Sequence, residues 1–341
     1  MAFGHIPKHM TSVGIGLENT PGTFVDPDAA YALPFTRAKI GDEPEMDEHK
    51  GPGAGMDTKA QYMTGRDTPI EYDGEVDIDA IGFVFANAYG GYSWATGKHT
   101  WIGPTWEPTD PVTTHTNRRQ PWTLWENPKN FGKASTLNRK AGGVYGSRLE
   151  IAGQHRKALT FKVSGFGFKW ETDTSASITN VVPTQVPIFH GKGFWTLKIG
   201  SGTLHTVVPK EFTAILDEAL EGDRDTLQDA NMFDISTVLP GERKHSIAMK
   251  IPLRGPYGED LVTYLAGPRT DDIELVGTWT VGSKILKITL AAGKIEGDPF
   301  DEATKSKDPY YFNLTVTAEG APIKIELTNE VAENGYYYQA A

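Results

Sequence analysis

Hydrophobic and polar residues alternate strictly between Ile70 and Ile78. On one side lie Ile70, Tyr72, Gly74, Val76 and Ile78, and on the other lie Glu71, Asp73, Glu75 and Asp77. Because side chains of a strand point alternately to its two faces, this pattern predicts a strand with one apolar and one acidic face. Neighbouring carboxylates on such a face lie about 7 Å apart and must be solvated or matched. We expect a sheet that presents a negative surface.

Short apolar runs separated by turn residues follow along the chain, which contains 37 glycines and 22 prolines. Such runs are typical of a β-sandwich or β-barrel. The expected strands are Arg148–Ala152, Ala158–Trp170, Phe194–Ile199, Ser246–Ile251, Ile273–Trp279, Ile285–Leu290, Tyr310–Val316 and Ile323–Leu327. In the longest run the apolar positions change register at Ser164 and Gly165, where glycine permits a bulge. The sequence therefore predicts a mainly β protein.

Two segments are expected to be helical. One is Ala80–Tyr89, with Asp79 as its N-cap and Gly90 as its C-terminal stop. The other is Pro209–Glu221, closed by Gly222, in which apolar residues recur at helical spacing. Each follows a β run and precedes a long loop and further strands. This repeated order suggests two tandem β-sandwich or barrel modules, each with a flanking helix, at residues 1–170 and 191–341, joined by a linker at 171–190.

Two stretches are expected to be long loops. Gly41–Arg66 contains an acidic group followed by glycines, and Lys98–Lys140 lacks clear periodicity. Loops of this length in a compact domain are usually functional or disordered. The candidate contact residues in them are Asp42, Glu43, Glu45, Asp47, Glu48, Trp101, Trp106, Trp122 and Trp125. Tryptophan is enriched in interface hot spots, although these four side chains can equally cover the end of a sheet.

Composition narrows the chemistry further. The chain has 341 residues, a formal net charge of −11 and no cysteine. An acidic protein repels phosphates, which disfavours ordinary nucleic-acid binding. The histidines do not cluster with acidic residues at metal-like spacing, and we find no nucleotide-binding or nucleophile motif. We expect no enzyme activity, no metal and no cofactor, and a protein without membrane anchor that folds in a cytoplasm.

Several short motifs occur in a fixed order along the chain. The chain opens with Val13–Glu18, Thr20–Thr23 and Tyr31–Phe35, and later contains the strand–helix element Pro69–Gly91. The set continues with His99–Trp101, Gln120–Leu124, the strand around Asn313 and Ile325–Asn329. This ordered set resembles the tail tube (major tail) proteins of siphophages. The Trp-rich stretch at 98–140 is longer than expected for that family.

The resemblance implies a structural virion protein that polymerises in the host cytoplasm into the tail. Six tube domains would form a closed β-barrel ring, contributed by three chains if both halves are tube modules and by six chains otherwise. Stacked rings would surround a tape-measure protein, end at terminator and distal tail proteins, and later let double-stranded DNA pass without specific binding. Glu71, Asp73, Glu75 and Asp77 are then candidates for a negatively charged lumen, and the two long loops for contacts between subunits or rings.

Two other classes remain open. One is a different β-rich phage protein of the tail, baseplate or receptor-binding kind, which assembles without endless stacking. The other is a carbohydrate-binding protein that uses the Trp-rich stretch as a sugar platform.

Overall fold

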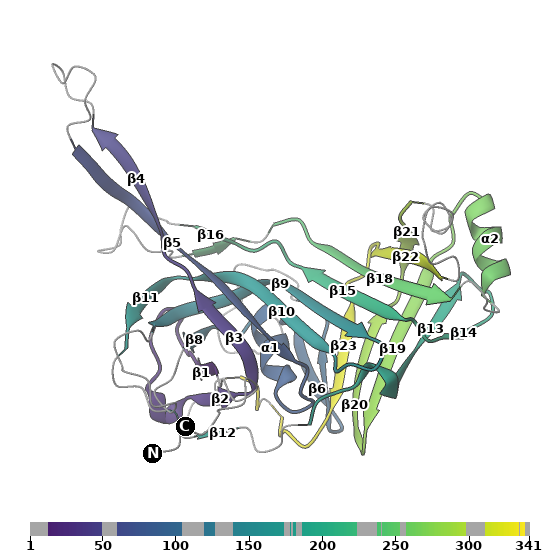
Figure 1. The fold of residues 1–341 in the computed structure, drawn as a ribbon, viewed down its shortest axis with the longest axis horizontal. Coiled ribbons are helices and arrows are strands. Elements are labelled where there is room, and N and C mark those ends of the chain that lie inside the picture. The colour runs from purple at the N-terminus through teal and green to yellow at the C-terminus, as the bar shows by residue number, and fades with distance from the viewer. Residues whose placement is uncertain are drawn as a thin grey trace, which may run out of the picture.

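The protein is mainly β, as expected (Figure 1). The structure, a computed structural model, describes residues 13–49, 60–103, 119–126, 139–173, 178, 180–181, 186–223, 237–239, 241–252, 257–297, 311–333 and 335–337. Within these residues a large sheet lies over a seven-stranded sheet and two α-helices accompany them. One hydrophobic cluster joins both halves of the chain, for example Ile70 and Phe161 with Trp195 and Leu286.

Most of the large sheet is a continuous run of antiparallel strands. In spatial order these are β3 (Phe35–Ile40), β5 (Ala60–Glu75), β10 (Thr160–Gly167), β9 (Arg139–Gln154), β15 (Glu211–Asp217), β18 (Lys244–Pro252), β22 (Tyr311–Ala318) and β21 (Gly293–Ile295). One side of this run packs on the core and the other faces solvent, so buried and accessible residues alternate along strands such as β15 and β18.

The order of strands in this run repeats. In the first half of the run the strands follow one another in the chain as β3, β5, β9 and β10. Side by side in the sheet, their order is β3, β5, β10 and β9. In the second half the chain order is β15, β18, β21 and β22, and the order in the sheet is β15, β18, β22 and β21, so the last two strands are exchanged in both halves. In each set a hairpin begins in the chain after the first strand, and an α-helix follows the second strand. The two sets meet where β9 pairs with β15.

The first part of β9 belongs to a side branch of the same sheet. It pairs with β8 on one edge and with β11 on the other. The branch consists of β8 (Trp122–Trp125), β1 (Val13–Leu17), β2 (Tyr31–Leu33), β12 (Asn180–Val181) and β11 (Lys169–Thr172). The strand β9 thereby takes part both in the continuous run and in the side branch.

The seven-stranded sheet draws strands from both halves of the chain. Its order is β14 (His205–Val207), β13 (Gly193–Ile199), β19 (Ile273–Val281), β20 (Lys284–Leu290), β23 (Lys324–Thr328), β7 (Lys98–Trp101) and β6 (Tyr92–Ala95). The late strand β23 joins β20 to the early strand β7. Two short 3-10 helices, η2 (Pro27–Ala29) and η6 (His190–Lys192), lie in connections.

The first expected helix is confirmed as α1 (Ile81–Ala88), and every one of its residues is buried. It lies under the large sheet and contacts β9 (Figure 1). Gly82 lies so close to the Tyr336 ring that a Cβ atom there would be 2.2 Å from it. Gly90 ends the helix with a positive φ of 71° and donates its N–H to the Phe85 carbonyl.

The second expected helix is wrong. Residues 211–217 form strand β15, in which Phe212, Ala214 and Leu216 are buried and the residues between them are partly exposed. The chain instead forms α2 (Gly258–Ala266), which packs beside β13 and lies where the sequence pattern predicts no helix. Of the described helices, neither is long and apolar enough to cross a membrane.

The Gly41–Arg66 stretch is not simply a loop. Strand β4 (Glu43–His49) pairs with the first part of β5 to form a hairpin that projects from the large sheet (Figure 1). In the second half, the hairpin of β16 (Glu221–Asp223) and β17 (Thr237–Leu239) lies at the corresponding place in the strand order. The expected bulge is confirmed between Ser164 and Gly165, where a Cβ on Gly165 would be 1.9 Å from the Tyr145 carbonyl oxygen.

Candidate functional site

The solvent-facing side of the large sheet is the candidate functional surface. On strand β5 the predicted alternation holds from Ile70 to Glu75, with Ile70 and Tyr72 buried and Glu71 and Asp73 facing solvent. The strand then ends at Glu75, earlier than the expected Ile78. Glu71, Asp73 and Glu75 therefore share one accessible row, as predicted, and Asp77 does not belong to it.

Basic residues of the two neighbouring strands match this acidic row. Arg37 of β3 lies 2.9 Å from the Asp73 carboxylate and 3.6 Å from that of Glu71. From the other side, Lys162 of β10 lies 3.8 Å from Glu71. Because these side chains are substantially exposed, each pair contributes at most about 1 kcal/mol. Their effect is local: they balance the charge that the sequence pattern alone assigns to the surface.

The same mixture of charges extends across the sheet. The charged residues on this face are Arg37, Lys39, Arg148, Lys162, Lys244, Lys250 and Lys294, together with Glu71, Asp73, Glu75, Glu150, Glu211 and Asp217. Small polar or apolar residues such as Thr160, Ala152, Thr213 and Ala248 lie between them. The face is thus wide, polar and nearly charge-balanced rather than purely acidic.

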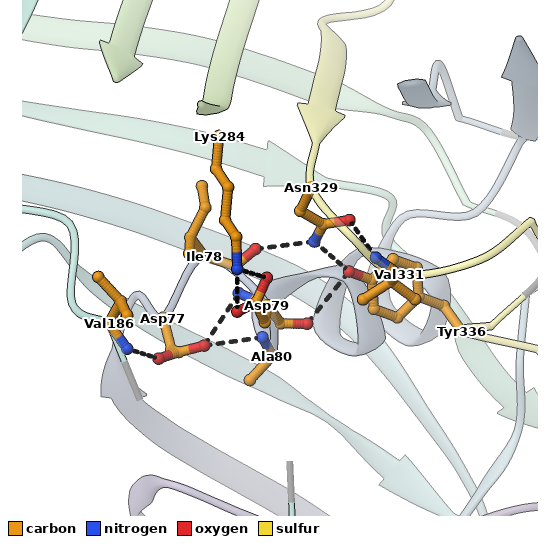
Figure 2. Close-up of polar contacts among 9 residues, drawn as sticks. All are labelled: Asp77, Ile78, Asp79, Ala80, Val186, Lys284, Asn329, Val331 and Tyr336. Carbon is orange, nitrogen blue, oxygen red and sulfur yellow. Dashed lines mark hydrogen bonds and ion pairs between the residues drawn. The ribbon is translucent and has the colours of Figure 1, made fainter. Parts of the chain in front are cut away.

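Asp77 has a structural role instead. It is only 5% exposed, and its carboxylate accepts hydrogen bonds from the N–H groups of Asp79 and Ala80, both at 2.9 Å, and from that of Val186 (Figure 2). Burial raises the pKa of this carboxyl, against the opposing effect of these N–H donors. Asp77, rather than the predicted Asp79, therefore satisfies the backbone where the chain turns into α1.

Asp79 contributes to a second network at the same turn. Its carboxylate lies 2.7 Å from Nζ of Lys284, and this hydrogen bond raises the pKa of the lysine. The Asn329 side chain donates to the Ile78 carbonyl at 3.0 Å, and Tyr336 donates its hydroxyl to the Asp79 carbonyl at 3.1 Å (Figure 2). The end of β5 is thus tied to the second sheet and to the C-terminal segment.

A buried ionic cluster lies where the two halves meet. Glu218, 1% exposed, lies 2.7 Å from Arg119 and 3.0 Å from Arg243. Arg119 also donates to the carbonyls of Ala88 and Gly146, so it links α1, β9 and the end of β15. Burial lowers the pKa of His245, 3.4 Å from Glu218, to about 4. Breaking such a buried pair typically costs 3–5 kcal/mol, on the order of a third of a domain's stability.

The described tryptophans of the second stretch do not form an exposed platform. Trp101, Trp122 and Trp125 are all fully buried, two of them on strand β8, so their expected role as contact residues is wrong. Trp106 lies outside the described residues. Because these three side chains are buried, none of them can form part of a sugar-binding platform on the surface.

In the projecting hairpin, Glu43 and Glu45 are exposed, and Asp42 forms an ion pair with Arg66 at 2.9 Å. Asp47 and Glu48 lie on β4, and their side chains are outside the described part of the chain. Among the described residues no group of histidine and acidic side chains is arranged to hold a metal ion. A scan against protein-family models and a search of curated proteins found no match to this chain.

Proposed function

We propose that this chain is a non-catalytic structural protein that polymerises as stacked rings into a phage tail tube. The observation that carries the proposal is the repeated strand order within one continuous sheet. A module that is built twice in a chain, with its sheet continuing from the first copy to the second, has the geometry of a ring segment. We therefore take the halves as two tandem tube modules.

The junction between the halves suggests how chains join. There, β9 of the first set pairs with β15, the first strand of the second set. The corresponding strands at the ends of the run are β21 and β3. Pairing β21 of one chain with β3 of the next would repeat the internal junction and remove both sheet edges, which otherwise invite uncontrolled pairing. Such head-to-tail contacts close into a ring when the rotation permits.

The polar face of the sheet would then line the lumen. Its exposed cations lie among carboxylates, as Arg37 does between Asp73 and Glu71, so fewer of them are available to phosphates. The chain as a whole is acidic, with a net charge of −11. DNA would pass such a wall without adhering, as a tape-measure protein would before it. The protein would then reside in the virion tail, where the tube would end at terminator and distal tail proteins.

The test is electron microscopy of the purified protein over a concentration series. Rings or hollow tubes of uniform width support the proposal. A monomer that never assembles overturns it, and compact particles that never stack favour a baseplate or receptor-binding protein instead.

The proposed junction is tested separately by cysteine trapping, which is clean because the chain has no cysteine of its own. Lys39 of β3 and Lys294 of β21 both lie on the polar face. The double variant Lys39→Cys/Lys294→Cys should form covalent oligomers with a short bismaleimide after assembly. The matched control Lys39→Cys/Lys198→Cys, with Lys198 on the second sheet, should not.

A further inference from the structure

The backbone groups at the outer edges of β3 and β21 restrict how these two strands can pair. In an antiparallel sheet, alternate residues direct both their N–H and C=O groups to the same neighbouring strand. The Gly41 N–H donates inward to β5 at 2.8 Å, and the Glu296 N–H donates inward to β22 at 3.0 Å. The adjacent residues Ile40 and Ile295 therefore direct their backbone groups to the outer edges, where a further strand can bind them.

Burial restricts the register further. Ile40 is 1% exposed and Ile295 is 6% exposed, so both side chains lie on the core side of the sheet. Residues directly opposite each other in a sheet share a face, and a shift by one residue would turn the apolar face of a strand to solvent. A continuous sheet therefore allows Ile40 to face Ile295 or a residue two positions away from it, such as Gly293.

The junction inside the chain selects one of these registers. Each half of the run contains a row of four buried residues, one from each strand, that begins with alanine and ends with leucine or isoleucine. The rows are Ala38, Tyr72, Val163 and Leu149 in the first half, and Ala214, Ile247, Val316 and Ile295 in the second. Leu149 pairs across the junction with Leu216, two residues beyond Ala214. The equivalent partner of Ile295 is Ile40 of a second copy, two residues beyond Ala38.

The charges on the polar face favour the same register. In the register taken from the internal junction, the exposed Lys39 faces the exposed Glu296, and opposite charges at directly opposed positions stabilise a sheet. A shift of two residues, toward Gly293, would instead place Lys39 opposite Lys294, and like charges there are destabilising. The direction of the backbone groups, the burial, the internal repeat and the charges therefore agree on one register.

We propose that β21 of one copy pairs with β3 of a second copy in this register, with Ile295 opposite Ile40 and with Glu296 opposite Lys39. This inference rests on the proposed tube function and names the residues that meet at its junction between chains. The occupant of the edge is a second copy, because the contact repeats one that the chain already makes between its own halves.

In the single chain two side chains occupy the edge of β3. Arg139 donates to the Ile40 carbonyl at 3.0 Å, and the Glu126 carboxylate accepts the Ile40 N–H. Pairing transfers both backbone groups of Ile40 to Ile295 of the second copy. The two side chains thus cover this part of the edge until the partner strand arrives, which protects it from pairing with unrelated strands.

Disulfide formation tests the register. Because Lys39 and Glu296 direct their backbone groups away from the junction, they form a non-hydrogen-bonded pair with Cα atoms about 4.5 Å apart, within reach of a disulfide. Lys39→Cys/Glu296→Cys should therefore form covalent oligomers when the assembled protein is mildly oxidised. The matched control Lys39→Cys/Lys294→Cys places the cysteines diagonally, about 7–8 Å apart, and should form none unless a bismaleimide is added.

Charge reversal tests the ion pair. Lys39→Glu or Glu296→Lys alone should raise the protein concentration needed for ring assembly roughly threefold or more, because like charges then face each other. Both substitutions in one chain should restore assembly. The control Lys198→Glu makes the same change in charge on the second sheet and should leave assembly unchanged. Sedimentation and electron microscopy provide the readout, with circular dichroism to verify folding.

The outcomes separate the register from the function. Rings in which Lys39→Cys/Glu296→Cys forms no disulfide overturn this inference while the tube function stands. Single reversal variants that assemble as the wild type does also overturn it. A wild-type chain that makes neither rings nor tubes overturns the proposed function itself.

Discussion

Asp77, two residues beyond the end of β5, has a different role from the acidic residues on the strand itself. The period-two pattern from Ile70 to Ile78 continues through Asp77 in the sequence, but the strand ends at Glu75. Asp77 then turns inward, where three backbone N–H groups bond to it. Sequence alternation identifies the accessible residues while the strand lasts. It cannot locate the strand's end, which here depends on Val186, more than a hundred residues away.

Removing this carboxylate should destabilise the fold. In Asp77→Ala the N–H groups of Asp79, Ala80 and Val186 lose their acceptor in a buried place. We expect a loss of about 2 kcal/mol in unfolding free energy, from the cap and the additional unsatisfied donor. Urea unfolding measures it. Asp73→Ala, on the exposed face of the same strand, loses only its ion pair with Arg37 and should cost at most about 1 kcal/mol. Equal losses in the two variants would contradict the assigned role.

His245 should make stability depend on pH. Its pKa is about 4 in the folded protein against an ordinary 6.5, because burial and the nearby Arg243 disfavour the charged ring. Between these values the unfolded chain binds more protons. The histidine's contribution is therefore complete above pH 6.5 and is lost as the pH falls toward 4, at up to about 1.4 kcal/mol per pH unit.

Denaturant unfolding of wild type and His245→Phe between pH 4 and 7.5 isolates this effect, since phenylalanine keeps the ring but does not titrate. Glu218, Arg119 and Tyr89 surround the ring in both proteins, so their titration largely cancels in the difference. The stability of the wild type should fall relative to that of His245→Phe as the pH falls from 6.5 toward 4. Parallel curves over this range would show that His245 does not titrate as described.

At the scale of elements, the sequence pattern predicts most of the strands but does not always distinguish a strand from a helix, as β15 shows. Phe212 and Leu216 fit both a period of two and a period of 3.6, which made residues 209–221 look helical. The β-branched Thr213 and Ile215 favour a strand, and the structure leaves both on the accessible face. The missed α2 carried weaker but real signals, with Glu259 and Asp260 in its first turn and Leu261 and Tyr264 on its buried side.

The tryptophans illustrate a second limit of the same kind. Trp101 and Trp122 lie in a stretch without periodicity, yet both are fully buried. Trp101 packs against Phe85 of α1 and Tyr336 near the C-terminus, and Trp122 packs against Tyr72 of β5. These partners are distant in sequence, so no local pattern could assign the side chains to the core. Large apolar residues in an irregular stretch are therefore weak evidence for an interface.

At the scale of the whole molecule, the repeated strand order has a consequence for the size of a ring. If each half is one tube module, a ring of six modules, as the resemblance to tail tube proteins implies, contains three chains. Mass photometry or native mass spectrometry of the smallest ring should then give three times the chain mass of 37.3 kDa, about 112 kDa. A ring of six chains would mean that only one half contributes to the wall, and β9–β15 would then not be a model for the contact between copies.

The ring mass and the cross-link between Lys39→Cys and Lys294→Cys are independent measurements, because the first counts copies and the second identifies the sheet edges that meet. Agreement between them would make the internal junction and the junction between chains two instances of the same antiparallel contact.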